Sequence, residues 1–467
     1  MLELVVLCLG ALLLVWFCIW QNPKRNRKLP PGSMGFPIIG ETMEYFSLYS
    51  LLEISPFMKK RITRYGPMFR TSLVGQKVVM VTDPELISGM LKQEIMPPIQ
   101  WFTQYSVKVS GEDQFVLSAS FHKYLRSFFM HQLSPESLMT GESIREIDQA
   151  TRRHLNWWAT QGAIDARQMV AEYVAKKIGY DEPNAAEKLS ENVRAFVDNR
   201  TSLIPLNIPG TAYHAELKAS RNLMKLIDET FEKRKASKIN HHDTFVDHLL
   251  EELKKGDTGL DEAIARDLVL LFIITTSEAI TLSITLAMKL IADHPKVLAE
   301  LMKEHEAIIE SRVEDKELEI TWEEYKSMEF THMVINEMVR VGNLVPILPR
   351  KLPKDVDING YTIPAGWFLV ADQTVLHFDP NYFDEPFAFN PWRWEGKKGH
   401  TGTKTFIPFG GGAGFCVGAN FGKLQIAIFL HHLVTKYKWS EIKRNDISRG
   451  PVLSLPNGFF VEISKRK

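Results

Sequence analysis

The stretch from about Arg266 to Asp293 is apolar on nearly every side of a helix, and it is the feature that most constrains the fold. A helix without a polar face belongs in the interior of a protein. The sequence therefore predicts a long buried helix with other elements packed around it. The helix should stop at Pro295, because proline lacks the N–H that a helix interior needs.

The segments before this helix also show helical periodicity. Apolar residues recur at the spacing of one helix face in Ser143–Trp158, Ala166–Lys177, Glu187–Asp198, Tyr213–Lys235 and Asp243–Leu253. Strand patterns are short and few, at Val78–Thr82 and Val356–Ile358, and Asn359-Gly360 predicts a tight hairpin after the second. We expect a mainly α fold with small β-sheets.

Composition favours one large domain. The chain has 467 residues, of which 45% are hydrophobic and 24% charged, and its 56 basic and 56 acidic side chains cancel. A net charge of zero gives no sign of a nucleic-acid partner. No polar low-complexity linker or internal repeat interrupts the sequence after residue 40, so we expect a single domain over residues 41–467.

The N-terminal segment predicts a membrane anchor. Residues 4–20 form an apolar run, at the short end of the about 17–25 residues that cross a bilayer. Four basic residues follow between Lys24 and Lys28. A cleaved signal peptide is the alternative, but the positive cluster favours a retained single-pass anchor over residues 1–21, with the domain in the cytosol. Residues 22–40 are basic and rich in proline, which predicts a stiff hinge.

Cys416 is the cysteine with the most informative surroundings. The other two cysteines lie in the N-terminal apolar run, so the domain has no pair to form a disulfide, which fits a reducing compartment. Cys416 lies in the loop Phe406–Gly418, which holds Gly410, Gly411, Gly412, Gly414 and Gly418. Glycines let a chain pass beneath a flat cofactor and aim N–H groups at a thiolate ligand. The alternative is a buried structural cysteine.

A second group of residues predicts a charged network. Glu337 and Arg340 are spaced i,i+3 among apolar neighbours, so a helix places both charges on one face. Arg393 lies between two tryptophans, and its guanidinium could complete a network with this pair. Alternatively, these residues form a solvated ion pair and a surface cation–π contact.

These segments, in this order, resemble the cytochrome P-450 superfamily of haem-thiolate enzymes, from Leu29 to the end of the chain. The resemblance implies the cytochrome P-450 fold, with a catalytic domain that binds haem b. It implies that Cys416 is the axial ligand of the haem iron, in a cofactor loop that includes Phe409, Gly410 and Gly418. It also implies that Glu337, Arg340 and Arg393 form a structural network.

The chain departs from the superfamily pattern on the central helix. Members carry an acid followed by a threonine, which help bring protons to oxygen on the iron. Glu278 matches the acid, but Ala279 stands in place of the threonine. A relay residue typically contributes about 10²–10⁴-fold to the rate. Either another donor serves, such as Thr281, Ser277, a water or the substrate hydroxyl, or oxygen activation is impaired.

A second departure concerns the cofactor loop. The superfamily usually has an arginine two residues before the cysteine, where it binds a haem propionate, and this chain has Gly414. His122, Arg126 and Arg350 match other propionate partners of the family. Because propionates lie near the surface, where water shares the charge, we expect haem to bind, although less tightly.

Within the superfamily the chain is similar to plant enzymes that oxidise sterols and triterpenes, such as brassinosteroid-pathway and thalianol hydroxylase-like members. The similarity lies in Leu29–Glu41, Ile320–Met328, Ile363–Trp367 and Phe389–Trp394. It implies a monooxygenase of the endoplasmic reticulum membrane that takes electrons from NADPH-cytochrome P-450 reductase. Leu203–Gly210 resembles a loop over the substrate pocket, and the alternative is an ordinary proline-broken loop between helices. A haem-thiolate isomerase or lyase that needs no oxygen, or a non-catalytic paralogue, is the alternative.

Overall fold

The computed structural model describes residues 28–37, 39–92, 119–133, 141–161, 164–165, 170–182, 184–199, 206–237, 244–256, 259–312, 319–397, 403–442, 447–454 and 459–466. The helices are α2 (Thr42–Tyr45), α3 (Pro56–Tyr65), α4 (Pro84–Lys92), α5 (Ala119–Leu133), α7 (Gly141–Gln161), α8 (Ala171–Ile178), α9 (Ala185–Asn199), α10 (Ala212–Ala236), α11 (Phe245–Lys255), α12 (Glu262–Asp293), α13 (Pro295–Glu310), α14 (Trp322–Ser327), α15 (Glu329–Gly342), α16 (Gln373–His377) and α17 (Ala419–Lys436). The 3-10 helices are η3 (Pro391–Trp394) and η4 (Gly412–Gly414). The strands are β1 (Tyr49–Ser50), β2 (Met68–Leu73), β3 (Gln76–Val81), β4 (Ile164–Asp165), β5 (Ile347–Lys351), β6 (Val356–Ile358), β7 (Tyr361–Ile363), β8 (Phe368–Asp372), β9 (Tyr437–Glu441), β10 (Ser448–Arg449), β11 (Leu453–Ser454) and β12 (Phe460–Lys465).

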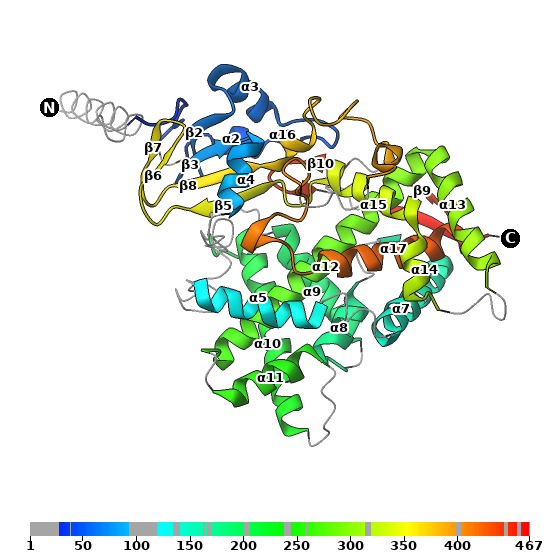
Figure 1. Ribbon diagram of the computed structural model, residues 1–467. Helices are drawn as coiled ribbons and strands as arrows, with labels where there is room; N and C mark the ends of the chain where they lie inside the picture. The colour runs from blue at the N-terminus through cyan, green and yellow to red at the C-terminus, as the bar shows by residue number, and fades with distance from the viewer. Residues whose placement is uncertain are drawn as a thin grey trace.

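The predicted central helix is α12, and it crosses the middle of the helical part of the molecule (Figure 1). Of its 32 residues, 16 are buried. Helices α8, α9, α10, α11, α13, α15 and α17 all contact it. Within the described ranges it is the one helix long and apolar enough to cross a membrane, and 56% of its most apolar window is buried inside the protein. It ends before Pro295, which begins α13, so the prediction of a long buried helix is confirmed.

The other predicted helices are confirmed with ends shifted by a few residues. They are α7, α9, α10, α11 and α8, although the predicted start of α8 at Ala166 lies outside the described residues. The hairpin of β6 and β7 turns at Asn359 and Gly360, whose φ angles of 48° and 74° suit the tight turn that the dipeptide predicts. The predicted anchor over residues 1–21 also lies outside the described residues.

A four-stranded sheet in the order β2-β3-β8-β5 forms the second part of the fold, beside the helices (Figure 1). β3 pairs with β8 in parallel, with Val78 opposite Phe368, while the other neighbours are antiparallel. The described end of the hinge packs on this sheet, because the Arg70 N–H donates to the Pro31 carbonyl at 2.8 Å and Met34 is fully buried. The remaining sheets have two or three short strands, so the mainly α fold with small sheets is confirmed.

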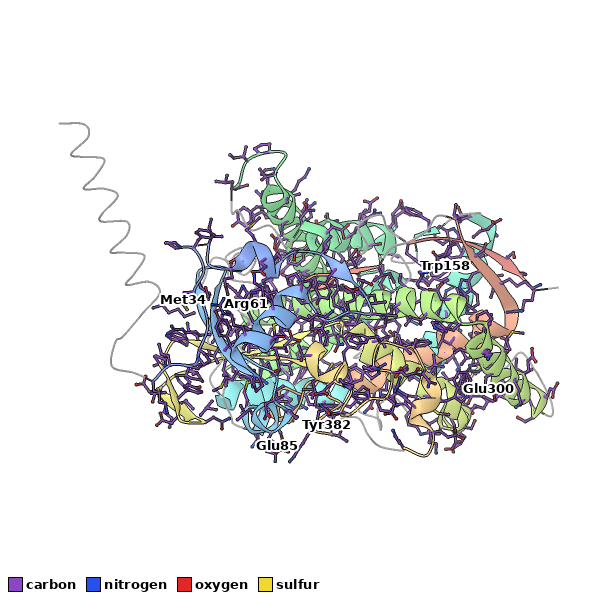
Figure 2. All side chains as sticks on the ribbon, turned by 90° about the horizontal axis from the view of Figure 1, so that it is seen from above. Met34, Arg61, Glu85, Trp158, Glu300 and Tyr382 are labelled. Atoms are coloured by element: carbon purple, nitrogen blue, oxygen red, sulfur yellow. The ribbon has the colours of Figure 1, made fainter. Side chains whose placement is uncertain are left out.

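Side chains fill the space between the elements, as Figure 2 shows. One large hydrophobic cluster joins the helices, with Trp158, Phe429 and Leu286 among its fully buried members. Two smaller clusters cover the faces of the four-stranded sheet. The sheet and the helix bundle therefore each have an apolar core of their own.

Three histidines are buried together where α7, α13, α15 and α17 meet. His431 and His305 lie 3.1 Å apart through their Nδ1 atoms, and the Nε2 of His305 lies 3.0 Å from the hydroxyl of Thr331. The Nε2 of His432 lies 2.7 Å from a carboxylate oxygen of Asp148. Burial lowers the pKa of His305 to about 3, and it also lowers the pKa values of His431 and His432.

We expect this cluster to make the fold sensitive to acid. Below about pH 6.5 the unfolded chain binds protons on these histidines that the folded protein does not bind, so the free energy of unfolding falls as the pH drops from about 6.5 toward 3. Urea unfolding across this pH range measures the slope. His305→Gln should reduce the slope, because it removes one of the buried groups that stay unprotonated in the folded protein. An equal slope in wild type and His305→Gln would contradict the prediction.

Candidate functional site

The glycine-rich loop before α17 closes on itself through a backbone hydrogen bond and holds Cys416 near its end. The Cys416 N–H donates to the Phe409 carbonyl at 2.8 Å, which closes the loop. Gly410 has φ +73°, and a Cβ there would lie 3.1 Å from the Gly414 carbonyl oxygen. Gly412 has φ +58°, and a Cβ there would collide with the Leu91 carbonyl at the end of α4. These two positions therefore require glycine.

The Cys416 thiol is exposed, yet protein surrounds it. Burial raises the pKa of the Cys416 thiol, while the Gly418 N–H and the charge of Arg126 act in the opposite direction. An N–H donor and a nearby cation both favour a thiolate. The arrangement keeps the sulfur open on one side and prepares it for a cation that would complete its deprotonation.

Helix α5 fixes one side of this loop. Arg126 donates a hydrogen bond from its Nη1 to the Phe415 carbonyl, next to the cysteine. His122 belongs to the same helix, but its side chain lies outside the described residues. The structure therefore places Arg126 beside the cysteine loop, and its role as a propionate partner stays a prediction.

Arg350 reaches the loop from β5. Its side chain is buried, and burial lowers the pKa of its guanidinium. Its Nη1 donates to the Pro349 carbonyl at 2.9 Å, and within the described ranges no carboxylate pairs with it. Its Nη2 lies 2.8 Å from the place where a Cβ on Gly414 would stand. The guanidinium thus occupies space that a side chain at position 414 would need.

Lys423 on α17 is a residue near this loop that the sequence pattern did not single out. Its ammonium lies 5.4 Å from the ring centre of Phe409 and donates to Asn336 at 3.1 Å. Burial lowers the pKa of Lys423 to about 8. An exposed helix lysine and a buried one look alike in sequence, because the difference depends on packing between α15 and α17.

The structure places Glu337, Arg340 and Arg393 together in one charged network. Glu337 on α15 is fully buried and accepts hydrogen bonds from Arg340 at 2.8 and 2.9 Å and from Arg393 at 2.9 Å. It also accepts from the Asn390 N–H and the Trp394 indole, both at 2.9 Å. Neither the indole donor nor the backbone donor was predicted from the sequence. The network joins α15 to η3 and so holds the segment that precedes the cysteine loop.

The central helix carries a line of accessible residues. Thr275 and Ala279 are exposed in the middle of α12, although helices pack around it. Leu271, Ile274, Glu278 and Leu282 on the same side are partly exposed. We call these six residues the accessible stripe. The stripe is therefore the side of α12 that its neighbours leave open, and we call the space in front of it the opening.

Aromatic side chains connect α12 to α5. Phe272, three residues before Thr275, stacks on Phe245 with ring centres 4.8 Å apart, and Phe245 stacks on Phe129 of α5 at 5.3 Å. Helix α5 is the element that also holds the cysteine loop through Arg126. The central helix and the cysteine loop are therefore both linked to α5.

The structure buries the side chains of Thr281 and Ser277. Each helix residue advances about 100°, so Thr281 lies about 200° around the helix from Ala279 and about 20° from Ile274. Glu278, in contrast, belongs to the stripe. A proton supplied by the buried Thr281 would need another group to reach the opening.

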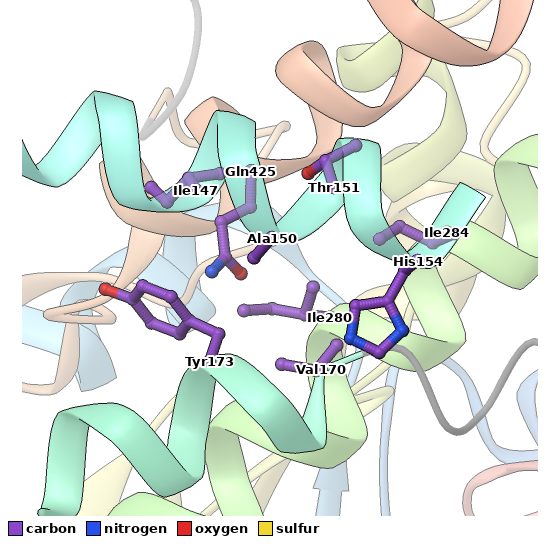
Figure 3. A pocket seen from close by; sticks show the side chains of 9 residues that line it. All are labelled: Ile147, Ala150, Thr151, His154, Val170, Tyr173, Ile280, Ile284 and Gln425. Carbon is purple, nitrogen blue, oxygen red and sulfur yellow. The ribbon is translucent and has the colours of Figure 1, made fainter. Parts of the chain in front are cut away.

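A separate small cavity lies on another side of α12, between α7, α8 and α17 (Figure 3). Its volume is about 30 Å³, which is room for one or two water molecules. Gln425 is buried, points into it, and has a side-chain oxygen with no partner in the part of the chain that the structure describes. The cavity is too small for a lipid-sized substrate, and its lining is mostly apolar apart from a few polar side chains such as Gln425.

Comparison with known proteins agrees with this geometry. A family model for Cytochrome P450 matches residues 30–462. Cytochrome P450 87A3 of Oryza sativa subsp. japonica is 40% identical over 96% of this chain and 88% of its own length. Beta-amyrin 16-alpha-hydroxylase CYP87D16 of Maesa lanceolata is 37% identical over 96% of this chain and 95% of its own length.

The fold has a solved counterpart. Retinoic acid bound cyanobacterial CYP120A1 superposes with a TM-score of 0.79, covering 94% of this chain and 100% of that chain, at 21% identity. Identity at that level shows the fold alone. With the match of the family model to almost the whole domain, the chain belongs to the cytochrome P450 family of haem-thiolate monooxygenases.

Proposed function

We propose that this chain is a membrane-anchored monooxygenase that oxidises a triterpenoid or sterol with molecular oxygen and electrons from NADPH-cytochrome P-450 reductase. The observation that carries the proposal is Cys416, whose thiol is exposed although the surrounding protein raises its pKa. A thiol that is open on one side and supported by an N–H donor is suited to bind iron. The membrane anchor remains the N-terminal segment over residues 1–21.

Haem b, the cofactor of the family, fits the residues present. Cys416 would bind the iron, and the guanidinium groups of Arg126 and Arg350, with His122, would hold the two propionates. Arg350 suits this role because it is buried without a carboxylate partner in the described ranges, and a buried charge requires one. When bound, the haem supplies the activation of oxygen.

The apolar residues of the accessible stripe favour a large apolar substrate. Leu271, Ile274 and Leu282 are partly exposed on the side of α12 that faces the opening. A relative is named for hydroxylation of β-amyrin, a triterpene. We therefore assign the substrate to the triterpenoids or sterols. One oxygen atom enters a C–H bond and the other leaves as water, for which two electrons and two protons are needed.

Such an apolar substrate would reach the protein through the membrane, and the loop Leu203–Gly210 has exposed side chains that suit contact with lipid. Leu206 and Ile208 are more than half exposed in the described part of the loop Leu203–Gly210, whose first three residues lie outside the described residues. Neighbouring exposed apolar side chains suit contact with lipid. This loop would lie at the endoplasmic reticulum membrane, on the cytosolic side.

Ala279 is the observation that favours a second candidate. It is exposed on the stripe but has no hydroxyl. A haem-thiolate isomerase or lyase needs no oxygen activation and so tolerates this change. A protein that binds haem or lipid without turnover is the third reading.

Expression in microsomes, with and without the reductase, tests the three readings. The carbon monoxide difference spectrum of the reduced protein reports the iron ligand, and a panel of triterpenes and sterols that begins with β-amyrin reports turnover. A product that requires both NADPH and oxygen supports the monooxygenase. A product formed without them supports the isomerase or lyase, and a thiolate-type spectrum without any product supports the non-catalytic protein.

We expect Gly414→Arg to slow the loss of haem. The new guanidinium adds a second cation beside Arg350 for the propionates, and the flexible end of Arg350 can move the small distance that this requires. Transfer of haem to apomyoglobin measures the rate, and it should fall by roughly tenfold. Gly89→Arg on α4 is the matched control, because no atom lies within 4 Å of a Cβ there. An unchanged rate in Gly414→Arg would show that the lost arginine does not limit haem retention.

A further inference from the structure

The accessible stripe contains a hydroxyl one helical turn before Ala279. Thr275 is exposed on the same side of α12, and Thr276, the next residue, is only partly exposed. Ser277 and Thr281 are buried, and Ser283 donates its proton to the Ala279 carbonyl at 2.7 Å. Thr275 therefore carries the most exposed hydroxyl among the described residues of this helix.

The hydrogen bond of Thr275 fixes which part of its hydroxyl is available. Its Oγ1 donates to the Leu271 carbonyl at 2.7 Å. A hydroxyl has one proton and two acceptor sites, so the oxygen can still accept a hydrogen bond from the open side. Because the side chain is exposed, a water molecule has access to that oxygen.

The spacing places such a water beside Ala279. Residues four apart on a helix have Cβ atoms about 5–6 Å from each other. A water bound about 2.8 Å from the Thr275 oxygen, on the side toward Ala279, lies close to the Ala279 methyl. That is the space into which a threonine at position 279 would extend its hydroxyl.

We infer that Thr275 holds a water molecule beside Ala279, and that this water delivers protons to the reaction in place of the hydroxyl that position 279 lacks. The inference rests on the proposed monooxygenase function. Each turnover takes two protons from solvent, and the water passes them on while Thr275 keeps its own proton on the Leu271 carbonyl. Thr275 is a positioning residue that acts through the water.

Three variants of the haem-loaded protein test this inference. Thr275→Val keeps the shape and removes the hydroxyl, Thr275→Ser keeps the hydroxyl, and Thr275→Val combined with Ala279→Thr moves it to the family position. Thr285→Val is the matched control, because Thr285 is fully buried and lies ten residues, about 15 Å, along α12 from Thr275.

Two measurements are made on each variant. The first is product formed per NADPH oxidised, with released hydrogen peroxide as the complement. We expect Thr275→Val to lower this ratio by roughly tenfold or more, and Thr275→Ser and the double variant to retain it. The second is the infrared stretching frequency of carbon monoxide on the reduced protein, which senses nearby hydrogen bonds without turnover. This frequency should shift in Thr275→Val and stay at the wild-type value in Thr275→Ser and Thr285→Val.

The outcomes separate this inference from the proposed function. Wild-type protein that forms product, with neither the ratio nor the infrared band changed by Thr275→Val, would overturn the role of Thr275 and leave the substrate hydroxyl as the donor. A shift as large in Thr285→Val would also overturn it, because the effect would then be structural. Wild-type protein that forms no product with any substrate would instead refute the monooxygenase, while the infrared comparison still tests the held water.

Discussion

Cys416→Ser should abolish the thiolate-type carbon monoxide spectrum and lower monooxygenase activity below about one hundredth of wild type, because serine supplies no thiolate to the iron. The loop itself should survive. Its closing hydrogen bond runs from the backbone N–H of residue 416 to the Phe409 carbonyl and does not involve the sulfur. The spectrum and the rate of product formation in microsomes measure the two effects.

Two further variants show whether a loss of spectrum and activity in Cys416→Ser comes from the missing thiolate or from unfolding. Cys416→His offers a nitrogen ligand, so it should retain haem with a nitrogen-type spectrum and remain inactive. Cys18→Ser in the N-terminal apolar run is the matched control and should keep both the spectrum and the activity. Wild-type turnover in Cys416→Ser would contradict the haem-thiolate assignment of this residue.

The parts of the fold that follow local rules are predictable from the sequence. The long apolar stretch requires a buried helix whatever surrounds it, and α12 is found there. Asn359-Gly360 turns the chain by its own conformational preference. Glu337 and Arg340 share a helix face because of their spacing, and their apolar neighbours indicate that the face is buried.

The parts that depend on distant contacts were not predictable. β8 joins β3 in parallel from far along the chain, and no short pattern marks that pairing. The approach of Arg350 to Gly414 brings together a strand and a loop that the sequence separates. The accessible stripe is hidden for a related reason. α12 is apolar on nearly every side, so its sequence does not reveal which side faces the opening, and only the packing of its neighbours distinguishes Thr275 from Thr281.

The charged network offers the clearest test of how a buried site is held in place. Glu337 balances two guanidinium groups, those of Arg340 and Arg393, and accepts from an indole and a backbone N–H as well. Removal of one member of a buried ion pair is more costly than removal of the pair, because it leaves a charge without a partner. Here one carboxylate serves two cations, so its loss is the most damaging single change in the network.

Glu337→Ala should therefore lower the free energy of unfolding by about 3–5 kcal/mol, which is a large share of the stability of an ordinary domain. Glu337→Gln keeps the shape and some of the hydrogen bonds, so it should fold well enough to be measured and show a smaller loss. Glu323→Ala is the matched control, because that carboxylate is 80% exposed and pairs only with Lys326 among the described residues. Its loss should stay within about 0.5 kcal/mol. Urea unfolding of the three variants gives the comparison, and equal losses in Glu337→Ala and Glu323→Ala would show that the network contributes no more than a surface ion pair. A loss confined to the Glu337 variants would establish that α15 and η3 are held together by this one carboxylate, and with them the chain that leads into the cysteine loop.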